Sequence, residues 1–136
     1  MNEQENTKII QRTYELFKSG DDAFLKNFSD DISWELPEME NVPYAGKCNG
    51  IESVKEFFSR LGEAEQNLTL GGTEFIAKGD KVVVLGNHSW RVKETNKEYA
   101  SDFAHVFTFK DGKITGFKEY MDTAVRSKAH TAAKAA

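Results

Sequence analysis

Four segments in the second half of the chain constrain the fold most, because each has the composition of a strand and only short turn signals separate them. They are rich in β-branched and aromatic residues, which is typical of strands in a sheet. Turns this short join neighbouring strands in an antiparallel meander. The expected strands are residues 67–77, 81–93, 99–109 and 114–122, with turns at Gly79-Asp80, Thr95-Asn96-Lys97 and Asp111-Gly112.

The first half of the chain has helical patterns. Apolar residues recur at three- and four-residue spacing, with Asn6 or Thr7 as the first cap and Gly20 as the first stop. Residues 37–50 hold both prolines and form the longest loop, a typical place for a pocket rim. We therefore expect an α+β fold in which one curved antiparallel sheet wraps around three helices and encloses a pocket. The expected helices are residues 7–19, 22–30 and 51–62, and a short strand covers 32–36.

The length and charge of the chain limit the kinds of protein that it can be. A chain of 136 residues predicts one domain, assigned to residues 1–126, with a flexible C-terminal tail at 127–136. The 18 Lys and Arg against 22 Asp and Glu are interspersed, which argues against nucleic-acid binding. The longest apolar run, Val82 to Leu85, is too short for a membrane span, and the polar N-terminus predicts a cytoplasmic protein. Cys48 is the single cysteine, so neither a disulfide nor a zinc site is expected.

The candidate catalytic pair is His105 and Glu119, provided that both side chains share one face of the sheet. A two-residue Asp111-Gly112 turn would pair Ala104 with Glu119 and turn His105 to the opposite face. A three-residue loop with Gly112 in the left-handed position would instead place His105 beside Glu119. We favour the second arrangement, because it separates an aromatic face from a charged one.

An imidazole beside a carboxylate suits proton transfer. An apolar pocket raises the pKa of a carboxylate, a neighbouring imidazolium lowers it, and together the two groups can pass a proton near neutral pH. The alternative is a buried His–Glu hydrogen bond that only holds the sheet together.

Further side chains are candidates for binding a substrate in the same pocket. They are aromatic, histidine or methionine residues on the predicted inner face or the long loop, and each could equally belong to the core. Tyr14, in the apolar stripe of the first helix, is interpreted as a core residue. No phosphate loop, nucleophile elbow or metal-spaced histidine cluster is present in the sequence. The substrate-binding candidates are Trp34, Tyr44, His88, Trp90, Phe103, Phe107, Phe117 and Met121.

The sequence resembles the SnoaL-like polyketide cyclases and ketosteroid-isomerase-like proteins of the NTF2-like superfamily. The resemblance implies a cone-shaped α+β fold, a hydrophobic pocket, no cofactor or metal, and a homodimer formed through the outer sheet face. In polyketide-cyclising members a His on the penultimate strand and an acid fourteen positions later form the pocket pair, which places this role on His105 and Glu119. The segments that carry the resemblance are 14–21 (YELFKSGD), 30–35 (DDISWE), 43–46 (PYAG), 57–58 (FF), 103–109 (FAHVFTF), 111–114 (DGKI) and 119–122 (EYMD).

Other members of the superfamily fit less well. The Asp-Arg-Asp arrangement of limonene-epoxide-hydrolase-like proteins needs an Arg and a second Asp where this chain has Asn87-His88-Ser89. Ketosteroid isomerases have a base, a helix tyrosine and an acidic donor at the positions that are Leu36, Thr13 and His105 in this chain. The resemblance therefore does not imply steroid isomerisation by that mechanism.

The resulting hypothesis is a cofactor-free enzyme for a small hydrophobic carbonyl compound, of isomerase, cyclase or lyase type. Glu119 or His105 would remove a proton beside the carbonyl, and the partner, with Tyr44 or His88, would stabilise the enolate oxygen. The alternative is a non-catalytic protein of the same superfamily that binds a hydrophobic ligand or serves as a dimeric scaffold.

Overall fold

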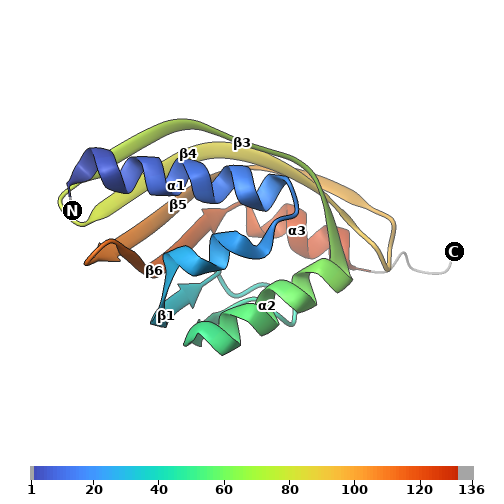
Figure 1. Ribbon diagram of the computed structural model, residues 1–136. Coiled ribbons are helices and arrows are strands. Elements are labelled where there is room, and N and C mark those ends of the chain that lie inside the picture. The colour runs from blue at the N-terminus through green and yellow to red at the C-terminus, as the bar shows by residue number, and fades with distance from the viewer. Residues whose placement is uncertain (1, 132–136) are drawn as a thin grey trace, which may run out of the picture.

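A computed structural model describes residues 2–131 of the chain. Six strands form one mixed sheet in the order β2-β1-β6-β5-β4-β3. The meander of four long strands is confirmed, and Figure 1 shows β3 and β4 arching over α1. The α+β cone expected from the sequence is therefore the fold of the protein. The strands are β1 (Phe28–Glu35), β2 (Lys47–Asn49), β3 (Glu65–Lys78), β4 (Lys81–Val92), β5 (Glu98–Lys110) and β6 (Lys113–Met121).

One strand pairing departs from the antiparallel prediction. Strand β1 runs parallel to β6, with Trp34 opposite Phe117, whereas β2 pairs antiparallel with β1. No tight turn joins β1 to β6, so the turn signals could not fix the direction of this pair. Strand β2 was not predicted, because its three residues lie inside the segment interpreted as a loop.

The helices differ from the prediction mainly at their ends. Helix α1 begins four residues early, because the Asn2 side chain accepts a hydrogen bond from the Glu5 N–H and caps it. The short second helix is a 3₁₀ helix, η1, and Phe28, predicted to lie in it, begins β1. The observed helices are α1 (Glu3–Lys18), η1 (Asp22–Asn27), α2 (Ile51–Ala64) and α3 (Thr123–His130).

Helix α3 occupies part of the segment that was predicted to be a flexible tail. The expected boundary at residue 126 falls inside this helix, whose Arg126 and Ala129 are buried. Asp122 caps it by accepting hydrogen bonds from two backbone N–H groups of the first turn. The rest of the predicted tail, residues 132–136, lies outside the described residues.

A bulge in β6 sets the register that brings His105 opposite Glu119. Asp111 and Gly112, both with positive φ, form a two-residue turn that pairs Lys110 with Lys113. The predicted three-residue loop is therefore wrong. Thr115 is an extra residue in β6, and beyond it the pairing shifts by one position, so His105 lies opposite Glu119 as expected.

Curvature of the sheet depends on a close approach of two strands at Gly86. A Cβ atom at this position of β4 would lie 2.1 Å from the Gly71 carbonyl oxygen and 2.7 Å from Cζ of Phe103. The β3–β4 register also shifts just beyond, between Gly72 and Glu74. Both features let the long strands bend over the helices and leave a hollow on the concave face.

Candidate active site

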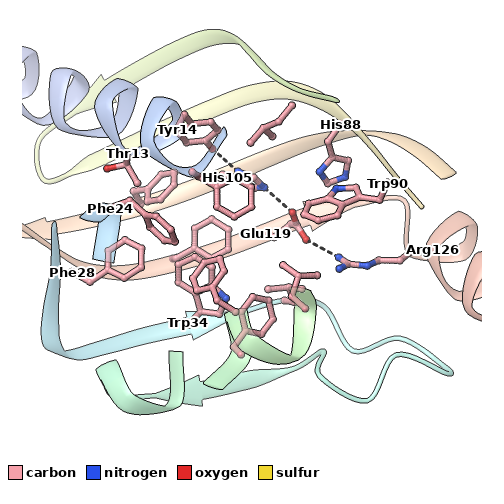
Figure 2. A pocket seen from close by; sticks show the side chains of 18 residues that line it. Thr13, Tyr14, Phe24, Phe28, Trp34, His88, Trp90, His105, Glu119 and Arg126 are labelled. Carbon is pink, nitrogen blue, oxygen red and sulfur yellow. Dashed lines mark hydrogen bonds and ion pairs between the residues drawn. The ribbon is translucent and has the colours of Figure 1, made fainter. Parts of the chain in front are cut away.

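The pocket is a cavity of about 100 Å³ between the concave face of the sheet and α1, η1 and α2. Most of its wall is aromatic or aliphatic, and Figure 2 shows the polar side chains spread across it from Thr13 to Arg126. The wall is formed by Thr13, Tyr14, Phe17, Phe24, Phe28, Trp34, Leu36, Phe57, Phe58, Leu61, Leu70, His88, Trp90, His105, Phe107, Phe117, Glu119 and Arg126.

Seven of the ten predicted site residues line this cavity. Tyr44, Phe103 and Met121 are not among its described wall residues, although each contacts a residue that is. Phe103 stacks on the His105 ring at 3.9 Å between ring centroids, so it orients the imidazole from behind. Those that line the cavity are Trp34, His88, Trp90, His105, Phe107, Phe117 and Glu119.

His105 and Glu119 form the buried pair at the polar side of the cavity. Nε2 of His105 lies 2.7 Å from Oε2 of Glu119, and the two residues are only 8% and 6% exposed. They face each other directly across β5 and β6. A carboxylate and an imidazole held this close inside an apolar wall can exchange a proton without a large movement.

Tyr14 of α1 extends this pair on the imidazole side. Its hydroxyl and Nδ1 of His105 share a hydrogen bond of 2.5 Å, so both ring nitrogens of His105 have partners. The interpretation of Tyr14 as a core residue missed this contact. Helical spacing places the residue on the inner face of α1, but no feature of the sequence indicates that its hydroxyl meets His105.

Arg126 of α3 extends the pair on the carboxylate side. Its Nη1 lies 3.4 Å from Oε1 of Glu119, while Nε and Nη2 lie 3.1 and 3.0 Å from Oε2 of Glu65. The guanidinium is thus shared between two buried carboxylates. Figure 2 shows the resulting chain from Tyr14 through His105 and Glu119 to Arg126.

A second buried cluster holds Arg126 in place. Glu65, at the start of β3, also contacts Nε2 of His130 at 2.8 Å and accepts a hydrogen bond from the Tyr99 hydroxyl. The Tyr44 hydroxyl lies 3.3 Å from Nη2 of Arg126. Tyr44 therefore supports the guanidinium. Sequence reasoning missed Glu65, Arg126 and His130, because they come from segments far apart in the chain. In addition, Arg126 was the last residue of the predicted domain, and His130 lay in its predicted tail.

These contacts shift the proton affinities of the site. Burial alone would raise the pKa of Glu119, but the hydrogen bond from His105 and the positive charges of His105 and Arg126 lower it to about 2. Burial and the nearby Glu119 carboxylate raise the pKa of the Tyr14 phenol well above its usual value. At neutral pH Glu119 is therefore a carboxylate and Tyr14 keeps its proton.

Burial also determines the charge of His88, whose ring packs against Trp90 and Phe103. It lowers the pKa of His88 to about 4, so this imidazole is neutral at pH 7. Nε2 of His88 and the indole nitrogens of Trp34 and Trp90 are buried without a hydrogen-bond partner among residues 2–131. Buried polar atoms without partners are uncommon, and these three belong to residues of the cavity wall, although the atoms themselves have almost no accessible surface.

Two further properties concern the described residues as a whole. Within residues 2–131, no three His, Cys, Asp or Glu side chains are placed to hold a metal ion together. The helices of that same region are all too short or too polar to span a membrane.

The fold and the lined cavity define an NTF2-like cone, a class in which a curved sheet and helices enclose one pocket. The model of the SnoaL-like domain matches residues 10–117, and the chain belongs to this family. No curated protein matches the chain.

Solved structures agree with this assignment. The chain is similar to an NTF2-like protein from Burkholderia xenovorans, with 29% identity, a TM-score of 0.86 and coverage of 96% of this chain and 99% of the other. TerC, co-crystallised with polyporic acid, has 28% identity and a TM-score of 0.83 over 93% and 98% of the two chains. A provisionally assigned SnoaL-like polyketide cyclase from Mesorhizobium loti shares the fold, with 22% identity and a TM-score of 0.70 over 83% and 96%.

Proposed function

We propose that the protein is a cofactor-free enzyme that moves a proton on a small, mostly apolar carbonyl compound, as an isomerase, cyclase or lyase. The observation that carries this proposal is the buried His105–Glu119 contact in the wall of an apolar cavity. The provisional assignment of one structural neighbour, the Mesorhizobium loti protein, as a polyketide cyclase is in line with this class of chemistry.

Glu119 is the base in this proposal, and His105 with Tyr14 supplies the acid. Oε1 of Glu119 takes the proton from the carbon beside the carbonyl, and the C–H electron pair forms the carbon–carbon double bond of the enol. Tyr14 gives its hydroxyl proton to the carbonyl oxygen and receives the proton that Nδ1 of His105 holds against it. Return of both protons in the opposite sense, with Glu119 protonating a different carbon, completes an isomerisation and restores the resting charges.

Arg126 offsets the cost of keeping Glu119 ionised in this site. A buried carboxylate without a cation would take up a proton and lose its function as a base. The same contact weakens Glu119 as a base, so the proposal favours carbon acids that are already activated, such as those between a carbonyl and a double bond or second carbonyl. TerC was crystallised with polyporic acid, which supports a small-molecule ligand for this pocket.

Deuterium exchange tests the proposal without knowledge of the natural substrate. Cyclohexanone and cyclohex-3-enone are incubated with the protein in D₂O, and mass spectrometry measures deuterium beside the carbonyl. Glu119→Gln should lower the enzyme-dependent rate by about 10²-fold or more, the usual contribution of a general base. Glu98→Gln, which removes an exposed carboxylate paired with Arg91, is the matched control and should exchange like the native protein. Native rates in Glu119→Gln would refute the role of Glu119.

The alternative function is ligand binding without turnover. The observation that favours it is that both oxygens of Glu119 already have partners within the protein, as in a structural network. Ligands that bind but exchange no deuterium would support this alternative. The homodimer and the cytoplasmic location remain predictions. Sedimentation equilibrium tests the first, and fractionation of cells that produce the protein tests the second.

A further inference from the structure

We infer that Glu65 is a positioning residue for the proposed reaction, and that it holds the guanidinium of Arg126 so that Oε1 of Glu119 stays free to take a proton. The inference rests on the proposed function and assigns a task to a side chain that takes no part in the proton transfer itself. Glu65 acts on Glu119 through Arg126, because Arg126 contacts both carboxylates.

The hydrogen bonds of Arg126 show where this cation acts. A guanidinium has five N–H groups, and the contacts of Arg126 account for each of them. Nε and one N–H of Nη2 donate to Oε2 of Glu65, and the second N–H of Nη2 donates to the Tyr44 hydroxyl. Nη1 lies 3.4 Å from Oε1 of Glu119 and 3.5 Å from Sδ of Met121. Arg126 therefore acts on Glu119 rather than on a ligand.

Arg126 divides its contacts unevenly between the two carboxylates. The two distances to Glu65 are 3.1 and 3.0 Å, within the usual range for N–H···O bonds, whereas the single contact with Glu119 is longer, at 3.4 Å. An arginine beside a carboxylate frequently forms two parallel hydrogen bonds with it. Figure 2 shows that Arg126 instead reaches Glu119 with one end of its side chain.

This uneven division leaves one oxygen of Glu119 weakly held. Oε2 is fixed by Nε2 of His105 at 2.7 Å, whereas Oε1 has the long contact with Arg126. A carboxylate oxygen has two lone pairs, so Oε1 keeps one for a substrate. Oε1 is the atom that takes the proton in the proposed reaction, and a stronger hydrogen bond from Arg126 would make it a weaker base.

Glu65 is itself held firmly, which makes it a fixed anchor for Arg126. Its side chain is fully buried, Nε2 of His130 lies 2.8 Å from Oε2, and Oε1 accepts a hydrogen bond from the Tyr99 hydroxyl. If Glu65 loses its charge, Glu119 is the other carboxylate that contacts Arg126. The guanidinium would then move toward Glu119 and shorten its contact with Oε1.

Glu65→Gln tests the inference, because glutamine keeps the shape of the side chain and removes its charge. Deuterium exchange of cyclohex-3-enone, measured over a range of concentrations at pH 7, gives kcat and KM. We expect kcat to fall about three- to tenfold, because the base is weaker, and KM to stay within about twofold, because Glu65 does not touch the ketone. Glu98→Gln, which removes an exposed carboxylate, is the matched control and should leave both constants unchanged.

A spectroscopic measurement follows the same effect without turnover. The chain has three histidines, so ¹⁵N-labelled histidine gives few ring-nitrogen signals, which single His→Asn variants assign. Glu65→Gln should move the signals of His130, which contacts Glu65, and those of His105, which contacts Glu119. In an Arg126→Met background, Glu65→Gln should move the His130 signals alone and lower kcat no further. A purely structural role of Glu65 would not make its effect on His105 depend on Arg126.

Three results would overturn the inference. They are a native kcat in Glu65→Gln, His105 signals that stay in place in this variant, and His105 signals that move equally with and without Arg126. The first two results decide the question even if Arg126→Met does not fold.

The two measurements also separate this inference from the proposed function. Equally fast exchange in the native protein and Glu65→Gln would overturn the inference and leave the proposed function intact. A native protein that exchanges no deuterium with any ketone, but whose His105 signals depend on Glu65 through Arg126, would refute the proposed catalysis and support the hold of Glu65 on Arg126.

Discussion

Replacement of Arg126 by Met tests the central electrostatic feature of the site. Arg126 is 2% exposed and its guanidinium lies between the Glu65 and Glu119 carboxylates, so its loss leaves two buried negative charges without their cation. Breaking a buried ion pair by removing one partner costs about 3–5 kcal/mol. Glu65 keeps His130 and Tyr99, and Glu119 keeps His105, so we expect a value near the lower end, about 3 kcal/mol at pH 7.

The pH dependence of this cost has a defined sign. Arg126 contributes to the lowered pKa of both carboxylates. A lowered pKa stabilises the native protein fully above the pKa of the unfolded chain, about 4.3 for Glu. For Glu119 this stabilisation is lost as the pH falls toward about 2. Without Arg126 both pKa values rise, so the variant loses less stability on acidification. The difference in unfolding free energy between native protein and variant should therefore shrink below pH 5.

Urea unfolding followed by circular dichroism measures both effects at pH 7 and pH 4. Arg91→Met is the matched control, because the Arg91–Glu98 pair on the outer face is 37% and 57% exposed at its side chains and should contribute about 0–1 kcal/mol. An unchanged m-value would show that α3 still unfolds with the rest of the domain. If Arg126→Met costs no more than Arg91→Met, the reasoning about the buried cation is refuted.

Three further predictions follow from single contacts. Since burial lowers the pKa of His88 from 6.5 to about 4, the native protein should lose roughly 3 kcal/mol between pH 7 and pH 4 through this residue. Urea unfolding of His88→Phe should lack that share of the pH dependence. Gly86→Ala should lower the unfolding free energy by about 2 kcal/mol or more, because the new Cβ would lie 2.1 Å from the Gly71 carbonyl oxygen. Gly62→Ala in α2, where a Cβ meets nothing within 4 Å, should raise the unfolding free energy by about 0.5–1 kcal/mol. Equal effects of the two substitutions would contradict the close approach at Gly86. Tyr14→Phe should slow deuterium exchange of cyclohex-3-enone about 10²-fold, and native rates in this variant would exclude Tyr14 as the proton donor.

The sequence predicts the meander and the His105–Glu119 contact for physical reasons that act locally. Strand composition and turn residues indicated where β3 to β6 lie, and the alternation of side chains along β5 and β6 indicated which residues share a face. The position of His105 opposite Glu119 was right although the turn was wrong. A separation of aromatic from charged faces constrains the pairing more strongly than the turn does, and the extra residue can enter at Thr115 as well as in the loop.

The rest of the site depends on contacts between distant segments, which no local pattern encodes. Tyr14 and Arg126 reach the pair from the first and last helices, and Glu65 reaches Arg126 from the start of β3. An apolar stripe does explain why Tyr14 faces inward, but the meeting of its hydroxyl with His105 depends on the angle at which α1 packs on the sheet. Arg126 lay at the edge of the predicted tail, where a charged residue is usually solvated.

The bulge at Thr115 makes the polarity of the pocket sensitive to a single insertion or deletion. With the two-residue turn retained, a chain that lacked Thr115 would pair Ala104 with the residue that is now Glu119, and the carboxylate would leave the concave face while Lys118 or Tyr120 took its place. The loss of one codon would thus turn Glu119 and Phe117 away from the cavity together and shift the pairing of β6 with β1, in which Trp34 lies opposite Phe117. In a hairpin of this kind, a change in length alters which side chains face the pocket, as a substitution does.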